Sequence, residues 1–158
     1  MKQLLTVVAL LALSHSFAQD ITGCEAISLS TESEIKEAEP CIIKLSAYVL
    51  TQPMMGSSKQ AHYSKKVVYN WIDVTPDYSF SLNNNVMKIF EDNNVLLFNT
   101  YISCLANAAL TKENDFEEYA LELLAIYLRE PDNKVDKSKA IEKFLLAWDT
   151  KSIKKYLK

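Results

Sequence analysis

The sequence predicts an all-α protein of about six antiparallel helices, arranged in one bundle or a short array of helical hairpins. Apolar residues recur at spacings of three and four through most of the chain after residue 30, which is the period of an amphipathic helix. Only two glycines occur in 158 residues, and this scarcity disfavours the tight hairpin turns of β-sheet proteins. Asparagine, aspartate and proline separate the periodic segments, as expected at helix ends.

The first half of the chain predicts three helical segments. Residues 30 to 34 begin Ser-Thr and end in Glu34, the pattern of a capping box. Pro40 then interrupts, and we expect it in the first turn of the next helix, which should end near Pro53. A further helix should run from about Lys59 to Asp73, because Pro76 disfavours helical backbone at the residue before it.

The second half begins with an extended connector. Residues 77 to 82 alternate polar and apolar side chains, but the chain offers no partner strand, so we expect no sheet. Asn83 to Asn85 should cap a short helix. The strongest core helix is expected from Asn93 to Leu110, where one stripe contains Leu97, Tyr101, Cys104, Leu105 and Ala108.

Two more helices and a short tail complete the prediction. Asn114 and Asp115 should cap a helix that ends before Pro131. Residues 141 to 148 place apolar side chains at positions i, i+3, i+4 and i+7, and residues 150 to 158 should add a final helical turn or two.

The first eighteen residues have the pattern of a secretory signal peptide. Lys2 precedes an apolar run from Leu4 to Leu13, and Ser16 and Ala18 are small residues at positions −3 and −1 of a cleavage site before Gln19. The run is about ten residues long, against about twenty for a helix that spans a bilayer. We therefore expect export to the periplasm or the exterior, with residues 1–18 removed, 19–30 a flexible lead-in and 31–158 a single helical domain.

An alternative for the leader is lipid anchoring. Ile21 to Cys24 has the residue types of a bacterial lipobox, in which the cysteine becomes lipidated, and the product would be an envelope protein anchored through Cys24. A lipobox normally follows the apolar run directly, whereas seven residues intervene here. Membrane contact is expected only for this alternative.

The cysteines predict at most one disulfide. Cys104 lies within an apolar stripe and resembles a small core residue, so Cys24 with Cys41 is the preferred pair in an oxidising compartment. Three cysteines without a Cys-x-x-Cys motif do not suggest zinc, and we expect no metal and no cofactor. The net charge is −3, and nucleic-acid binding depends on positive charge, so we expect no nucleic-acid partner.

The sequence assembles no set of nucleophile, base and oxyanion donors, so no residue is assigned a catalytic role. His62 is the only histidine after the leader, and with Asp73 or Asp77 it could serve a small periplasmic hydrolase. No serine lies in a Gly-x-Ser-x-Gly elbow. The leading hypothesis is a non-catalytic binding or interaction module with a protein or peptide partner.

The best candidate for a ligand or partner site is one segment rich in aromatic residues. Its members could line a groove, or they could close the core where the chain changes direction. They are Trp71, Thr75, Asp77, Tyr78 and Phe80. A second candidate is the basic tail, which could contact anionic lipid or simply favour a helix C-terminus. It consists of Lys151, Lys154, Lys155 and Lys158.

The segment from Trp71 to Phe80, the two helices after it and the ending Lys155-Tyr156-Leu157 resemble a group of short exported bacterial helical proteins with no assigned activity. The resemblance covers roughly residues 44 to 158. It implies export, a helical fold and single-domain size, and it supplies no catalytic residue.

Overall fold

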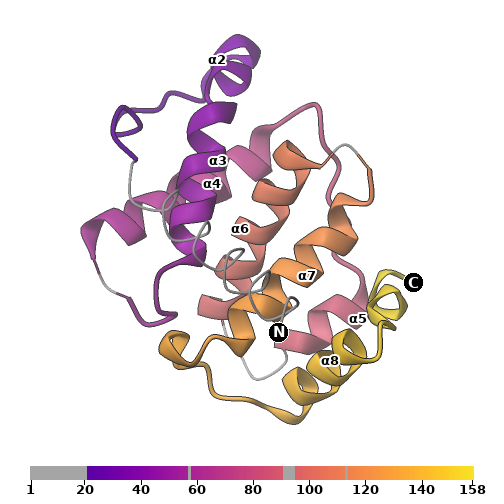
Figure 1. The fold of residues 1–158 in the computed structure, drawn as a ribbon. Coiled ribbons are helices and arrows are strands. Elements are labelled where there is room, and N and C mark those ends of the chain that lie inside the picture. Colours follow the sequence, from indigo (N-terminus) through magenta and orange to yellow (C-terminus); the bar gives the residue numbers. More distant parts are fainter. Residues whose placement is uncertain (1–20, 57, 91–94, 113) are drawn as a thin grey trace, which may run out of the picture.

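The structure, a computed structural model, describes residues 21–56, 58–90, 95–112 and 114–158. These residues form seven α-helices and three 3-10 helices and contain no strand, which confirms the predicted all-α class (Figure 1). The α-helices are α2 (Glu32–Glu37), α3 (Glu39–Leu50), α4 (Lys59–Val74), α5 (Asn84–Met87), α6 (Val95–Thr111), α7 (Phe116–Arg129) and α8 (Lys139–Asp149). The 3-10 helices are η1 (Lys88–Phe90), η2 (Pro131–Asn133) and η3 (Ile153–Leu157). The predicted signal peptide, residues 1–18, lies outside the described residues, as does Asn93, the expected start of the core helix.

Most helix ends follow the local rules that predicted them. Thr31 and Glu34 form a reciprocal capping box at the start of α2, and Pro40 occupies the first turn of α3. Asn83 caps α5 by accepting hydrogen bonds from the backbone N–H groups of Asn85 and Val86. The expected cap at Asp115 is wrong. Its backbone is left-handed (φ 54°), whereas a side-chain cap needs extended backbone at that position, and its carboxylate makes no capping hydrogen bond to α7.

Helix α6 lies at the centre of the fold. It packs against α3 and α4 on one side and against α7 on another (Figure 1). Ten of its seventeen residues are buried: Leu97, Thr100, Tyr101, Ile102, Ser103, Cys104, Leu105, Ala106, Ala108 and Ala109. The buried hydroxyls of Thr100 and Ser103 donate to backbone carbonyls four residues earlier, so their burial leaves no polar atom unpaired.

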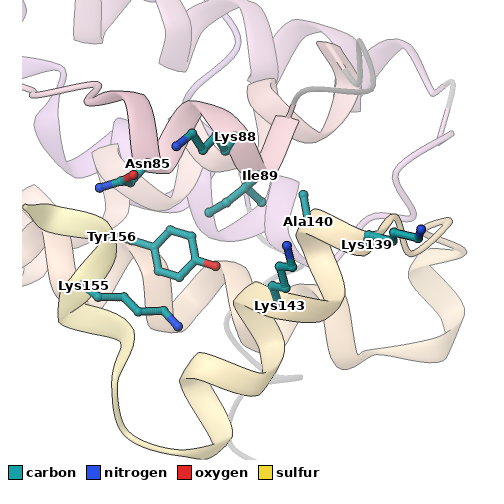
Figure 2. Close-up of a pocket in the computed structure, with 8 residues that line it drawn as sticks. All are labelled: Asn85, Lys88, Ile89, Lys139, Ala140, Lys143, Lys155 and Tyr156. Carbon is teal, nitrogen blue, oxygen red and sulfur yellow. The ribbon is translucent and has the colours of Figure 1, made fainter.

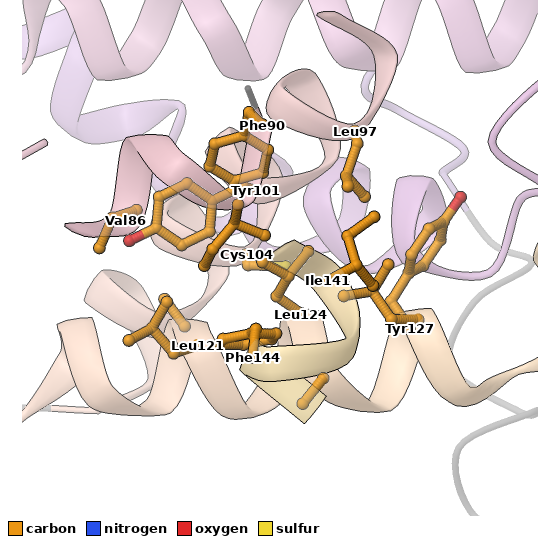
Figure 3. Packing of buried hydrophobic residues seen from close by; sticks show 14 of the residues in the cluster. Val86, Phe90, Leu97, Tyr101, Cys104, Leu121, Leu124, Tyr127, Ile141 and Phe144 are labelled. Carbon is orange, nitrogen blue, oxygen red and sulfur yellow. The ribbon is translucent and has the colours of Figure 1, made fainter. Parts of the chain in front are cut away.

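Two clusters of buried side chains share this helix. The larger one joins α5, η1, α6, α7, α8 and η3, and it includes Tyr101, Cys104, Leu124 and Phe144 (Figure 3). The smaller one joins α2, α3 and α4 to Ala106 of α6. Both clusters therefore pack against the same helix.

The described part of the predicted lead-in, residues 21 to 30, packs against the smaller cluster. Cys24 forms a disulfide with Cys41 of α3, as predicted, and only 1% of Cys24 is exposed. The Tyr63 hydroxyl of α4 donates to the backbone carbonyl of Cys24 at 2.9 Å. Ile21 is also buried. These contacts fix the start of the described chain onto two helices.

We predict that the disulfide is a major source of stability. The double variant Cys24→Ala/Cys41→Ala should lower the free energy of unfolding by about 3 kcal/mol, because the cross-link restricts the unfolded chain. Urea denaturation followed by circular dichroism measures this change. Dithiothreitol should destabilise the native protein and leave the variant unchanged, since Cys104 is already a free thiol. If dithiothreitol also lowered the free energy of unfolding of the double variant, the assignment of the disulfide to Cys24 and Cys41 would be contradicted.

Candidate functional site

The aromatic residues of the predicted segment pack into the core. Trp71 is fully buried, and its indole N–H donates to the carbonyl of Ile35 at 3.3 Å. The ring centroid of Tyr78 lies 5.8 Å from that of Trp71 and 6.3 Å from that of Phe116. Phe80 makes an edge contact with Phe116 at 5.8 Å. Of the two alternatives for this segment, the arrangement agrees with the one in which its aromatic side chains close the core where the chain changes direction.

The two polar residues of the segment point to different surroundings. The Thr75 hydroxyl is buried and has no hydrogen-bond partner among the described residues. Asp77 is exposed, and its carboxylate lies 4.0 Å from the Lys36 ammonium, a surface pair that contributes little to stability. Burial, together with the Glu39 and Asp77 carboxylates, raises the pKa of Tyr78. Neither Trp71, Thr75, Asp77, Tyr78 nor Phe80 lines any of the three pockets described below.

The residues of the alternative hydrolase are not brought together. His62 and Asp73 lie near opposite ends of α4, separated by about 16 Å at the usual rise of ~1.5 Å per residue. Asp77 faces Lys36 instead. Of the serines near His62, Ser58 caps α4 and Ser64 is buried with its hydroxyl donating to the Gln60 carbonyl, while Ser57 lies outside the described residues.

A pocket of about 440 Å³ lies between the α5–η1 segment, the start of α8 and η3 (Figure 2). We call it the basic pocket, because four of its eight lining residues are lysines. The lining residues are Asn85, Lys88, Ile89, Lys139, Ala140, Lys143, Lys155 and Tyr156.

Local hydrogen bonds set the walls of the basic pocket. Ser138 caps α8 by accepting from the backbone N–H of Ile141, which fixes where that helix begins. The side-chain amide of Asn83 donates to the main-chain oxygen of Tyr156 at 2.8 Å, and that of Asn85 donates to Lys158 at 2.9 Å. Two asparagines at the start of α5 therefore hold η3 in place.

Tyr156 is held from within the core as well. Its ring meets the buried Phe144 of α8 edge to face, with centroids 5.3 Å apart, and the Lys155 ammonium lies 5.6 Å from the Tyr156 ring centroid. Burial raises the pKa of Tyr156, so its hydroxyl stays protonated at neutral pH and can donate a hydrogen bond.

The basic pocket has a strongly positive lining. No acidic side chain is among its eight lining residues. Three ion pairs occur among the described residues, and none of them uses a lysine of the pocket. The start of α8 adds the positive end of a helix dipole beside Lys139 and Ala140. An anion is the ligand that this lining attracts.

A second pocket, of about 490 Å³, has the opposite character. It is lined by Glu118, Glu122, Trp148, Asp149, Lys151 and Ile153. Two of its carboxylates already have cationic partners, because Glu118 pairs with Lys154 at 2.8 Å and Asp149 pairs with Arg129. No group of three metal-ligating side chains with a suitable arrangement occurs within the described residues.

A third and smaller pocket, of about 320 Å³, lies beside the end of α4. Its lining includes Asp73, Val74 and Asn70 together with residues of the segment before α2. Asp73 is the only ionisable residue in its lining, so this pocket lacks the concentrated charge of the other two.

Nowhere in the described ranges is a helix long and apolar enough to cross a membrane.

Sequence reasoning found only one lysine of the basic pocket, Lys155, as part of the basic tail. Lys88, Lys139 and Lys143 come from other elements, and their proximity depends on how those elements pack. One signal was present in the sequence. Residues 131 to 158 contain eight lysines and four acidic residues, although the whole chain carries a net charge of −3. The positive charge is therefore concentrated at the C-terminal end.

Comparison with known proteins identifies no relative: no protein-family model, no curated protein and no solved structure matches the chain.

We predict that Trp71 and Asp77 differ sharply in their contribution to stability. Trp71→Phe should lower the free energy of unfolding by about 2–3 kcal/mol, because it removes a buried hydrogen bond and leaves space in the core. Asp77→Asn should change it by less than about 0.5 kcal/mol, because the side chain is exposed. Urea denaturation of both variants measures the difference. A large loss in Asp77→Asn would show that its pairing with Lys36 matters more than the geometry indicates.

Proposed function

We propose that the protein is an exported, non-catalytic binding protein whose basic pocket takes small anionic ligands. The observation that supports the proposal is that four lysines from three elements, η1, α8 and η3, line one pocket whose lining contains no acidic residue. Like charges held close together repel and raise the free energy of the folded protein. A bound anion would relieve that repulsion.

The dimensions of the pocket favour a small molecule. Its volume of about 440 Å³ falls within the range of roughly 300–1,000 Å³ that is common for small-molecule sites. Such sites combine apolar walls with a few polar groups, and here Ile89 and Ala140 supply the apolar part. This supports a ligand of metabolite size.

The lining chemistry supports binding over turnover. None of the eight lining residues is a histidine, carboxylate, serine or cysteine, which are the common bases and nucleophiles of hydrolases. The separation of His62 from Asp73 on α4 also argues against the hydrolase alternative. Lysines and a tyrosine hydroxyl can hold an anion by charge and hydrogen bonding without any chemical step.

Export and release from the membrane form part of the proposal. The leader pattern supports export, and a Cys24–Cys41 disulfide is compatible with an oxidising compartment. The disulfide also disfavours the lipid-anchored alternative, because the Cys24 sulfur cannot carry a lipid thioether while it is bonded to Cys41.

We predict that multiply charged anions stabilise the protein through this pocket. Pyrophosphate or citrate, at constant ionic strength, should raise the melting temperature of the native protein, because a ligand that binds only the folded state stabilises it. The double variant Lys143→Gln/Lys155→Gln should lose most of that shift. Differential scanning calorimetry measures it.

The matched control is Lys59→Gln/Lys66→Gln, which removes two exposed lysines of α4 and leaves the basic pocket intact. It should keep the anion-induced shift. Equal loss in both double variants would attribute the effect to overall charge and would contradict the proposed site.

We also predict that the exported product begins at Gln19. Intact-mass measurement of protein secreted from an expressing bacterium should give the mass of residues 19–158 less two hydrogens for the disulfide. A product that begins at Cys24 and carries acyl groups would instead establish the lipid-anchored alternative.

A further inference from the structure

We infer that the ligand of the basic pocket carries a phosphate group on a compact apolar body. This inference rests on the proposed function and names the chemical class of the ligand. Two features of the pocket carry it: the number of cations that line it and the apolar surface beside those cations.

The polar tips in the pocket converge from different elements. Figure 2 shows the Lys143 ammonium of α8 and the Lys155 ammonium and Tyr156 hydroxyl of η3 directed toward the space between these two elements. Lys88 and Asn85 lie across that space on the α5–η1 segment, whereas Lys139 points away from it. A ligand group placed there meets donors from more than one direction.

The number of cations favours phosphate over carboxylate. Four lysines line the pocket, and a group with two negative charges interacts with them more strongly than a carboxylate with one. A lysine ammonium acts as a point charge with three donors. A phosphate ester carries a charge of about −1.5 to −2 at neutral pH and has three terminal oxygens. Lys143, Lys155 and Tyr156 can therefore each donate to a different oxygen.

The start of α8 adds to this preference. Lys139 and Ala140 are the first two residues of that helix, and backbone N–H groups at such positions have no acceptor within the helix. Both residues line the pocket. The helix dipole thus increases the positive potential on the same side as Lys143, which favours a doubly charged group.

The apolar body follows from the rest of the lining. Ile89 and Ala140 face the space on which the ammonium groups converge, and the Tyr156 ring forms a further apolar surface (Figure 2). Inorganic phosphate would leave these surfaces in contact with water. An apolar group attached to the phosphate would cover them and add binding energy in proportion to the area removed from water.

The test is calorimetric titration of the mature, disulfide-bonded protein with three probes. They are 1-naphthyl phosphate, 1-naphthoate and inorganic phosphate. The first should bind at least about tenfold more tightly than either of the others, since it alone combines both features. If inorganic phosphate binds as tightly, the apolar body is wrong. If 1-naphthoate binds as tightly, the preference for phosphate is wrong. In both cases anion binding stands, whereas failure of all three probes and of pyrophosphate overturns the proposed function as well.

Single variants locate the binding. Lys143→Gln should weaken 1-naphthyl phosphate binding by about tenfold, because it removes a charged donor from an exposed position where folding does not depend on it. Tyr156→Phe keeps the ring against Phe144 and removes only the hydroxyl, so it should weaken the same probe with little change in melting temperature. Lys66→Gln on α4 is the matched control, with binding unchanged within about twofold. Equal weakening in all three variants would overturn the assignment to this pocket.

A phosphate on an apolar body can belong to a soluble ester or to a lipid head group. Vesicles of phosphatidylcholine with phosphatidic acid, compared with phosphatidylcholine alone, distinguish the two sources. A lipid source is assigned if the protein sediments with the phosphatidic acid vesicles. Both 1-naphthyl phosphate and the Lys143→Gln substitution should then abolish that sedimentation. Absence of sedimentation, together with tight binding of 1-naphthyl phosphate, assigns a soluble ester.

Discussion

The burial of α6 on more than one side is the constraint on which the rest of the structure depends. Its seventeen residues include no charged side chain, so the helix can be covered by α3 and α4 on one face and by α7 on another without leaving a charge in the core. The buried hydroxyls of Thr100 and Ser103 are paired within the helix, and the amide of Asn107 donates to the Ser46 hydroxyl of α3 at 3.2 Å. The buried Tyr101 hydroxyl has no hydrogen-bond partner among the described residues. Helices α3, α4 and α7 and the 3-10 helix η1 all pack directly against α6.

The basic pocket forms at the edge of the bundle, among α5, η1, α8 and η3. Helix α8 contacts α7, η1 and η3 but has no major contact with α6, so it lies at the edge of the bundle. Its inner face is anchored by Phe144, while Lys139 and Lys143 remain exposed on the side that faces α5 and η3. Asn83 and Asn85 complete the arrangement by binding the main chain of η3. Apolar burial thus brings the elements together, and the lysines that are left at their edges become neighbours.

The residues that stand out in the sequence are not the residues that line the basic pocket. The segment from Trp71 to Phe80 stands out in the sequence because it concentrates aromatic side chains, yet its rings stabilise the junction between α2, α4 and α7. Lysine is common throughout the chain, and on a helix it usually indicates only a solvated face. The pocket lysines gain significance from their shared location, which no local pattern in the sequence describes.

The sequence by itself determined the helical class and most helix boundaries, because periodicity, capping and proline rules act over a few residues. It favoured the Cys24–Cys41 pair without fixing it. It also identified α6 as a core helix from its apolar stripe. The left-handed backbone at Asp115 and the basic pocket were decided only by the tertiary structure. The pocket brings Lys88 together with residues more than fifty positions later in the chain, and such a contact is set by the packing of whole helices and not by any local preference.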